Sequence, residues 1–144
     1  MVNKQLLLIA EIEQKKEDQL ALQFAQAQQA LTAQYEKMAG LEKYQRDYME
    51  NIIEQGKGGI SSTSMSRFQA FVSQLDKACG QQKDNIEKAE KVVDQRRALW
   101  LQQQRKRKSI ELVVEKQKKL HQVKLGREEQ KMFDEIVTNR FARR

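Results

Sequence analysis

Before residue 55, apolar residues recur along the chain in steps that alternate between four and three residues. Only two of the ten members of this ladder are polar. They are Leu20, Phe24, Ala27, Leu31, Gln34, Met38, Leu41, Gln45, Tyr48 and Ile52. A mean period of 3.5 residues, kept over many turns, is typical of the buried seam of a coiled coil. The pattern predicts one long helix with an apolar edge that packs against another helix.

A second ladder with the same spacing follows further along the chain, and ten of its fourteen members are apolar. Its members are Phe68, Val72, Leu75, Cys79, Gln82, Ile86, Ala89, Val93, Arg96, Trp100, Gln103, Arg107, Ile110 and Val114. The shared period predicts that the second helix is the partner of the first.

The segment between the two ladders, residues 55–64, holds three of the six glycines and a cluster of Ser and Thr. Glycine ends helices because it tolerates left-handed backbone, and Ser or Thr caps the next helix. We therefore expect a reversal at residues 59 and 60. The predicted fold is all-α: one domain, residues 1–144, forming a long antiparallel two-helix coiled-coil hairpin. Helix 1 spans about 3–54, the hinge about 55–64 and helix 2 about 65–140.

The predicted reversal also sets the register, because it pairs position i of the first helix with position 119 − i of the second. Residue 3 then lies opposite residue 116, close to the point where the second ladder fades. We therefore expect the second helix to overhang, with residues 116–144 projecting as a single helix.

The composition argues against an enzyme. Proline is absent, 33% of residues are charged and 6% are aromatic, which is typical of long helices rather than of a thick core with a deep pocket. Cys79 and His121 are the only residues of their kinds, so we predict no disulfide, no metal site and no cofactor. The apolar run Leu6–Ala10 is too short to span a membrane, and we expect a cytoplasmic protein.

Apolar residues on both sides of the reversal form a surface that is wider than the seam needs. The register places Tyr48 beside Phe71 and Tyr44 beside Leu75, and a further apolar pair lies next to them, Leu41 with Ala78. This surface is either a partner site or the broad flank of the seam.

Charges are unevenly distributed. Between Arg96 and Lys108 there are six cations and no acid, while the opposing segment Glu11–Asp18 contains four acids. A basic helix can bind nucleic acid, but pairing between the two helices explains the same pattern, at about 0.5 kcal/mol for each exposed pair. We favour pairing, and a nucleic-acid-binding or purely structural scaffold protein is the alternative function.

The end of the chain carries an amphipathic stripe with no opposing helix. It comprises Met132, Phe133, Ile136 and Val137. Such a stripe is either a docking element or part of an unfolded tail, and we favour docking.

Taken together, these features resemble the flagellar FliJ family, over nearly the whole length. The resemblance depends on the order and spacing of several short patterns: Leu41-x-x-Tyr44-x-x-x-Tyr48, the Gly/Ser break, Phe68-x-x-Phe71-x-x-x-Leu75-x-x-Ala78, Trp100, a basic stretch, and Glu128-x-Gln130-Lys131-x-x-Asp134-Glu135. A virulence-type relative from the same export machinery is an alternative, although the residues near the reversal favour the flagellar one.

The resemblance implies a fold like the central stalk of rotary ATPases and a role in bacterial type III flagellar export. The implied partners are the export ATPase (FliI), its regulator (FliH), the export gate protein FlhA and export chaperones, with no nucleic acid and no small-molecule substrate. The implied location is the cytoplasmic face of the inner membrane. The family's gate-binding patch corresponds to Leu41, Tyr44, Tyr48, Phe71, Leu75, Ala78 and Gln82, with Lys37 at its edge. We expect the ATPase-binding end to include Met132, Phe133, Ile136, Val137 and Arg140.

Overall fold

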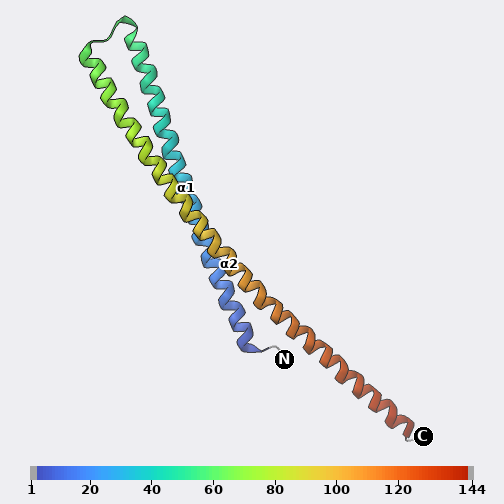
Figure 1. Cartoon of the computed structure of the whole chain (residues 1–144). Helices are drawn as coiled ribbons and strands as arrows, with labels where there is room; N and C mark the ends of the chain where they lie inside the picture. Colours follow the sequence, from blue (N-terminus) through green and yellow to red (C-terminus); the bar gives the residue numbers. More distant parts are fainter. Residues whose placement is uncertain (1–2, 143–144) are drawn as a thin grey trace. The chain divides into compact units, whose positions relative to one another are not determined.

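The computed structural model describes residues 3–142, which form two long helices joined by a short turn (Figure 1). The helices are α1 (Lys4–Gln55) and α2 (Ser62–Ala142), and the turn is a 3-10 helix, η1 (Gly56–Gly58). The two helices run antiparallel and pack against each other. The predicted all-α helical hairpin is therefore confirmed.

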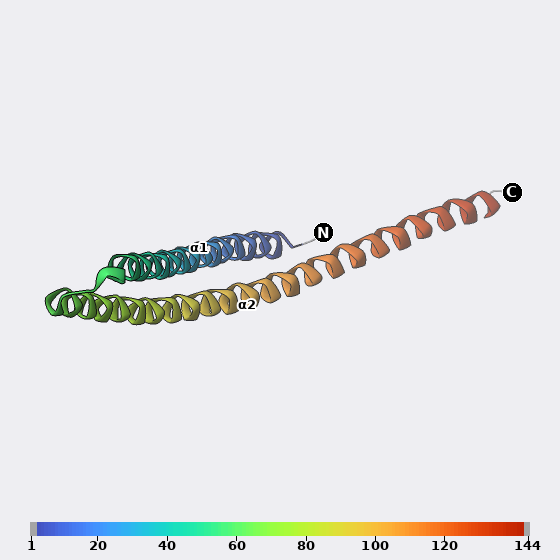
Figure 2. The same ribbon diagram turned by 90° about the horizontal axis from the view of Figure 1, so that it is seen from above.

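The chain divides into two compact units. We call Ala21–Leu99, which contains the reversal, the hairpin unit. We call Met1–Leu20 together with Trp100–Arg144 the terminal unit. In the terminal unit, α2 extends past the start of α1, as Figure 2 shows at its orange and red end. The assignment of residues 1–144 to a single domain stays a prediction.

Local chemistry explains where the helices begin and end. The Asn3 side chain accepts a hydrogen bond from the Gln5 amide at 2.9 Å and so caps α1. The Ser61 hydroxyl accepts one from the Ser64 amide at 3.1 Å and caps α2. Gly59 has a φ of 94°, a backbone conformation that glycine adopts without steric cost. The reversal therefore occurs where the glycine and serine residues predicted it, and α2 begins three residues earlier than expected.

The seam follows the two predicted ladders. All ten ladder positions in α1 and all fourteen in α2 are buried or half-buried. The apolar residues buried most completely are Ala27, Met38, Leu75, Val93 and Val114. Four of these five lie in the hairpin unit, so its seam is the more apolar of the two.

The predicted register is also confirmed in each unit. In the hairpin unit, the Tyr48 and Phe71 rings lie 4.2 Å apart between centroids, and the Arg96 guanidinium donates to the Gln23 side chain at 3.2 Å. In the terminal unit, the Lys106 ammonium lies 3.5 Å from the Glu13 carboxylate. The residue numbers of all three pairs sum to 119, as the reversal at residues 59 and 60 requires.

The seam extends further than the apolar ladders predicted. In α1, the half-buried Leu6 and Ala10 and the buried Glu13 and Glu17 continue the same spacing toward the N-terminus. In α2, two half-buried polar residues continue it past Val114, namely Gln117 and His121. Four of these six positions hold polar residues, so the spacing of apolar residues did not reveal this part of the seam.

Within residues 3–142, neither helix has a stretch long and apolar enough to cross a membrane.

Candidate interaction surfaces

Four aromatic residues from both helices form a cluster close to the reversal. The Tyr48 ring contacts Phe71 at 4.2 Å and stacks on Phe68 at 5.9 Å between centroids. The Tyr44 ring meets Phe71 edge to face at 6.0 Å. Such pairs contribute about 0.5–1.5 kcal/mol each beyond their buried area. The cluster therefore fixes the hairpin end and also holds Tyr44, which is 53% exposed, in a defined orientation.

The structure divides the residues of the predicted gate-binding patch into three levels of exposure. Tyr44 is exposed, and Leu75 and Gln82 are buried. The remaining four are half-buried, namely Leu41, Tyr48, Phe71 and Ala78. Of the seven, Tyr44 is therefore the one that exposes most of its side chain. The binding role of these residues stays a prediction.

Gln82 has a structural role in the seam. Its amide nitrogen donates to the Gln34 carbonyl at 2.8 Å and to the Gln34 side-chain oxygen at 2.9 Å. Its own oxygen accepts a hydrogen bond from the Asn85 side chain at 3.3 Å. Because both ends of the amide are engaged, Gln82 acts as a polar clasp between the helices and presents little surface.

A second polar contact links the helices on an exposed edge of the hairpin unit. The Tyr35 hydroxyl donates to the Glu90 carboxylate at 2.6 Å. This hydrogen bond, followed by burial and the negative charge of Glu90, raises the pKa of Tyr35 above its ordinary value. Tyr35 is 48% exposed, so it resembles Tyr44 in residue type, helix and exposure while it lies outside the aromatic cluster.

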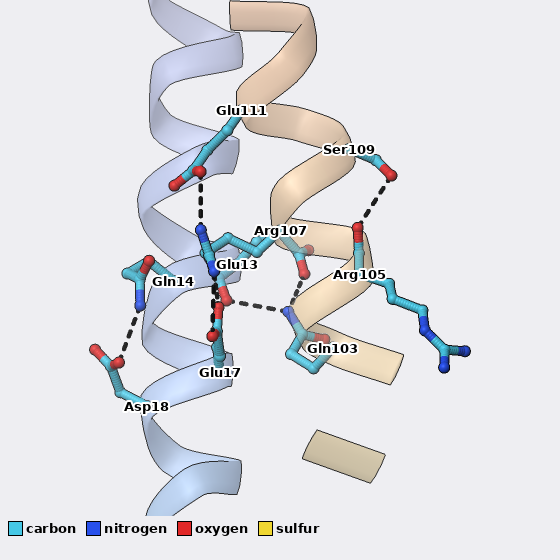
Figure 3. Close-up of polar contacts among 9 residues, drawn as sticks. All are labelled: Glu13, Gln14, Glu17, Asp18, Gln103, Arg105, Arg107, Ser109 and Glu111. Carbon is cyan, nitrogen blue, oxygen red and sulfur yellow. Dashed lines mark hydrogen bonds and ion pairs between the residues drawn. The ribbon is translucent and has the colours of Figure 1, made fainter. Parts of the chain in front are cut away.

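The terminal unit has two carboxylates at seam positions, and Figure 3 shows them facing α2. Glu13 is 5% exposed and Glu17 is 7% exposed. The Gln103 side-chain amide donates to both the Glu13 carbonyl, at 3.0 Å, and the Glu13 carboxylate. The Lys106 and Lys16 ammonium groups lie 3.5 and 3.4 Å from the same carboxylate. Every buried seam carboxylate of the terminal unit thus has a donor from α2.

Arg107 is the partner of Glu17. Its guanidinium forms a hydrogen-bonded ion pair with Glu17 across the seam and a second one with Glu111 on its own helix, at 2.8 Å (Figure 3). The hydrogen bonds that Arg107 donates to Glu17 and then to Glu111 raise the pKa of Arg107, against the opposing effect of burial. We call Glu13, Glu17, Gln103, Lys106 and Arg107 the polar seam.

The protonation of Glu13 responds to this environment. The hydrogen bond from Gln103 lowers the pKa of Glu13 below its ordinary value, burial opposes that effect, and the charges of Lys106 and Lys16 add to it. The carboxylate is therefore the form that the fold stabilises.

These contacts explain much of the basic run that the sequence analysis singled out. Arg107 and Lys106 bind seam carboxylates, Arg96 binds Gln23, and Arg97 lies over the Phe24 ring at 5.4 Å. Of the four opposing acids, Glu13 and Glu17 pair across the seam, while Asp18 accepts a hydrogen bond from Gln14 on its own helix at 3.0 Å. The signal that could have revealed Glu13 and Glu17 is their spacing from Leu20, which continues the ladder.

The overhang of α2 remains helical to Ala142. A contact near the start of α1 is the hydrogen bond from the Asn3 amide to the Gln117 side chain, at 3.4 Å. Beyond it, four residues of the predicted ATPase-binding end are exposed and one is half-buried: Met132, Phe133, Ile136 and Arg140 are exposed, and Val137 is half-buried. The stripe therefore lies within α2. Its binding role stays a prediction.

Within the described residues, no group of three or more His, Cys, Asp or Glu side chains is placed to hold a metal ion. Nor does any buried side-chain nitrogen or oxygen in that range lack a hydrogen-bond partner. The polar groups of the seam are thus used for pairing the helices.

Two long antiparallel helices that pack along one seam define the class of all-α helical-hairpin proteins. Residues 3–144 match the family model described as FliJ, Flagellar FliJ protein, so the chain belongs to the FliJ family. It is a component of the flagellar type III export apparatus. No curated protein and no solved structure matches it.

Proposed function

We propose that this FliJ-family protein is an adaptor that associates with the export ATPase FliI and its regulator FliH, stimulates ATP hydrolysis, binds the export gate protein FlhA and escorts export chaperones. In this role it supports flagellum assembly, motility and chemotaxis, and gate binding keeps it on the cytoplasmic face of the inner membrane. The observation that carries the proposal is the presence of two candidate partner surfaces that share no residue. One is the aromatic cluster around Tyr44, and the other is the exposed stripe near Phe133.

The surface around Tyr44 has the properties of a binding hot spot. Tyrosine combines a large apolar ring with a polar tip, and such residues dominate many interfaces when a rigid surrounding holds them. Phe71 holds the Tyr44 ring from the other helix, so little side-chain freedom is lost on binding. Leu75 and Gln82 contribute by supporting this surface from within the seam.

The gate proposal can be tested with two matched tyrosine variants. Tyr44→Ala should weaken binding to the cytoplasmic part of FlhA at least about tenfold, the cost of truncating a hot-spot residue. Tyr35→Ala removes an equally exposed tyrosine from the same helix and should leave binding unchanged. Isothermal titration measures both, and circular dichroism confirms that both variants remain helical. Equal effects of the two variants would remove the basis for the gate surface.

The stripe on the overhang suits the ATPase. An amphipathic helix with anchors at i, i+1, i+4 and i+5 binds an apolar groove of a partner through one face. Met132, Phe133 and Ile136 are exposed, and α1 does not cover them. Because the overhang presents one apolar face, its contact with a ring of ATPase subunits would favour one arrangement of those subunits over others.

A double variant tests this assignment. Replacement of Phe133 and Ile136 with Ser should abolish most of the stimulation of ATP hydrolysis, measured with purified FliI. The control is Leu22→Ser, since Leu22 is an exposed aliphatic residue of the hairpin unit. Stimulation that survives in the double variant would place the ATPase-binding surface elsewhere.

A further inference from the structure

One line of exposed residues on α2, all in the terminal unit, repeats with a period of eleven residues. An aliphatic residue is followed four and seven positions later by a cation, twice in succession. The line consists of Leu101, Arg105, Lys108, Leu112, Lys116, Lys119, Val123 and Arg127. Eleven residues are close to three helical turns, so an eleven-residue repeat keeps its members on one side of a nearly straight helix. We call these eight residues the outer stripe.

The outer stripe lies on the side of α2 away from α1. The seam side is occupied by Ile110, Val114 and Gln117, which are half-buried or buried. All eight stripe residues are exposed, and Leu112 is 63% exposed. Figure 3 shows the Arg105 side chain directed away from α1. Neither the seam nor the overhang stripe explains this surface.

The segment that carries the outer stripe has an excess of positive charge. Nine cations and two glutamates lie between Leu101 and Arg127. Lys106 and Arg107 are paired with seam carboxylates, and Glu111 binds Arg107. Within the described residues, no carboxylate forms an ion pair with any of the five stripe cations, namely Arg105, Lys108, Lys116, Lys119 and Arg127. The stripe is therefore complementary to a negatively charged surface.

We propose that the outer stripe binds the surface of a bilayer that contains anionic phospholipids, with the cations on the headgroups and Leu101, Leu112 and Val123 in the interface below them. A straight line about 39 Å long, at 1.5 Å per residue, matches a flat surface. A bilayer would bind both the cations and the aliphatic residues of the stripe, because anionic headgroups attract cations and the interfacial region accommodates aliphatic side chains.

Two other negatively charged partners, a nucleic acid and an acidic helix of another protein, would bind only some of the stripe residues. A DNA or RNA backbone would engage the cations through its phosphates but would leave the aliphatic residues in water. A partner helix would need an apolar residue at every third or fourth position, whereas the stripe has one in every eleven.

The test uses the full chain and cosedimentation with phosphatidylcholine vesicles, prepared with and without phosphatidylglycerol. We expect binding to the anionic vesicles only. The variant with Arg105→Gln, Lys108→Gln and Lys119→Gln should lose about a hundredfold in affinity, from the attraction of three cations near a charged surface. The control carries Lys118→Gln, Lys124→Gln and Lys131→Gln, which removes the same charge from other sides of α2. It should lose less than about threefold.

A second variant distinguishes a bilayer from other anions. Leu112→Ser with Val123→Ser keeps every charge, so it should weaken vesicle binding without changing retention on heparin. Inorganic phosphate should displace the protein from vesicles no better than chloride at equal ionic strength. Equal losses in the two glutamine variants, equal binding to neutral vesicles, or tighter binding to duplex DNA than to anionic vesicles would each overturn the proposal.

Discussion

In both the hairpin unit and the terminal unit α1 and α2 pack antiparallel, but the residues buried between them differ in chemistry. In the hairpin unit the buried positions hold Ala27, Met38, Leu75 and Val93, together with a single polar clasp at Gln82. In the described part of the terminal unit, residues 3–20 and 100–142, two of the three buried residues are the carboxylates Glu13 and Glu17. The first type of seam gains stability from removing apolar surface from water, and the second gains mainly specificity of register.

This difference has a physical basis. Apolar burial stabilises in proportion to the area removed from water. The cost of removing two charges from water offsets much of the attraction in a buried ion pair. Removing one member of the pair leaves a buried charge without a partner, which strongly destabilises the fold. A shift of α1 along α2 within the terminal unit would separate Glu17 from Arg107, whereas Val, Ala and Leu tolerate many neighbours. The polar seam therefore suits a unit that must hold its register with little apolar area.

The largest expected effect is the loss of an apolar seam residue. Leu75→Ala should lower the free energy of unfolding by about 3 kcal/mol, since it removes buried methyl groups and leaves a space. Urea denaturation followed by circular dichroism measures this. Leu22→Ala removes the same side chain from an exposed position and should change stability by less than about 0.5 kcal/mol. Equal effects would mean that the apolar seam does not dominate stability.

The second prediction concerns the ion pair of the polar seam. Glu17→Gln leaves the half-buried Arg107 without its partner across the seam, so amide exchange in the N-terminal part of α1 should accelerate about tenfold through local opening. The hairpin unit should be unaffected. Asp18→Asn, at the exposed neighbouring position, is the control.

Replacing both Glu17 and Arg107 tests whether an apolar seam is more stable than the ion pair at this position. Glu17→Leu with Arg107→Leu converts this part of the seam to the chemistry of the hairpin unit. Apolar replacements of buried pairs are often stabilising, so the melting temperature should rise above that of the unsubstituted protein. A melting temperature below that of Glu17→Gln would show that the ion pair contributes stability rather than register.

The smallest expected effect is the loss of stability of the N-terminal part of α1 as the pH falls. The pKa of Glu13 is lowered in the folded protein, so the folded state binds a proton less readily than the unfolded state does. The stabilisation from Glu13 is therefore complete above the ordinary value of 4.5 and is lost as the pH falls through the lower folded-state pKa. Hydrogen exchange should show α1 opening near its N-terminus in this acidic range. Glu13→Gln should reduce that dependence, and an unchanged profile would contradict it.

The fold could be predicted from the sequence to a large extent because its determinants are local. The 3.5-residue spacing, the glycines at residues 56, 58 and 59, and the serines that follow predicted two helices, their reversal and their register. The N-terminal part of the seam escaped prediction because Glu13 and Glu17 are polar, and a search for apolar periodicity does not count them. Their spacing from Leu20 continues the ladder, but the pairing with Gln103 and Arg107 that makes them seam residues is a feature of the structure.

The candidate sites were less predictable. The spacing of Tyr44, Phe71 and Leu75 placed them near one another, and the ring contacts agree. The spacing could not tell which of them is exposed, because a rotation of the helix by about one third of a turn exchanges a buried position for an exposed one. Leu75 and Gln82 are buried in the seam, and Tyr44 is exposed.

The sequence by itself determined the hairpin, its register and its membership of the FliJ family, because helix period, glycine conformation and capping act over a few residues. The tertiary structure decided which side chains remain available for partners and which charges are neutralised within the protein. Burial and ion pairing depend on the rotation of each helix against its neighbour, and a repeating pattern along one helix does not contain that information.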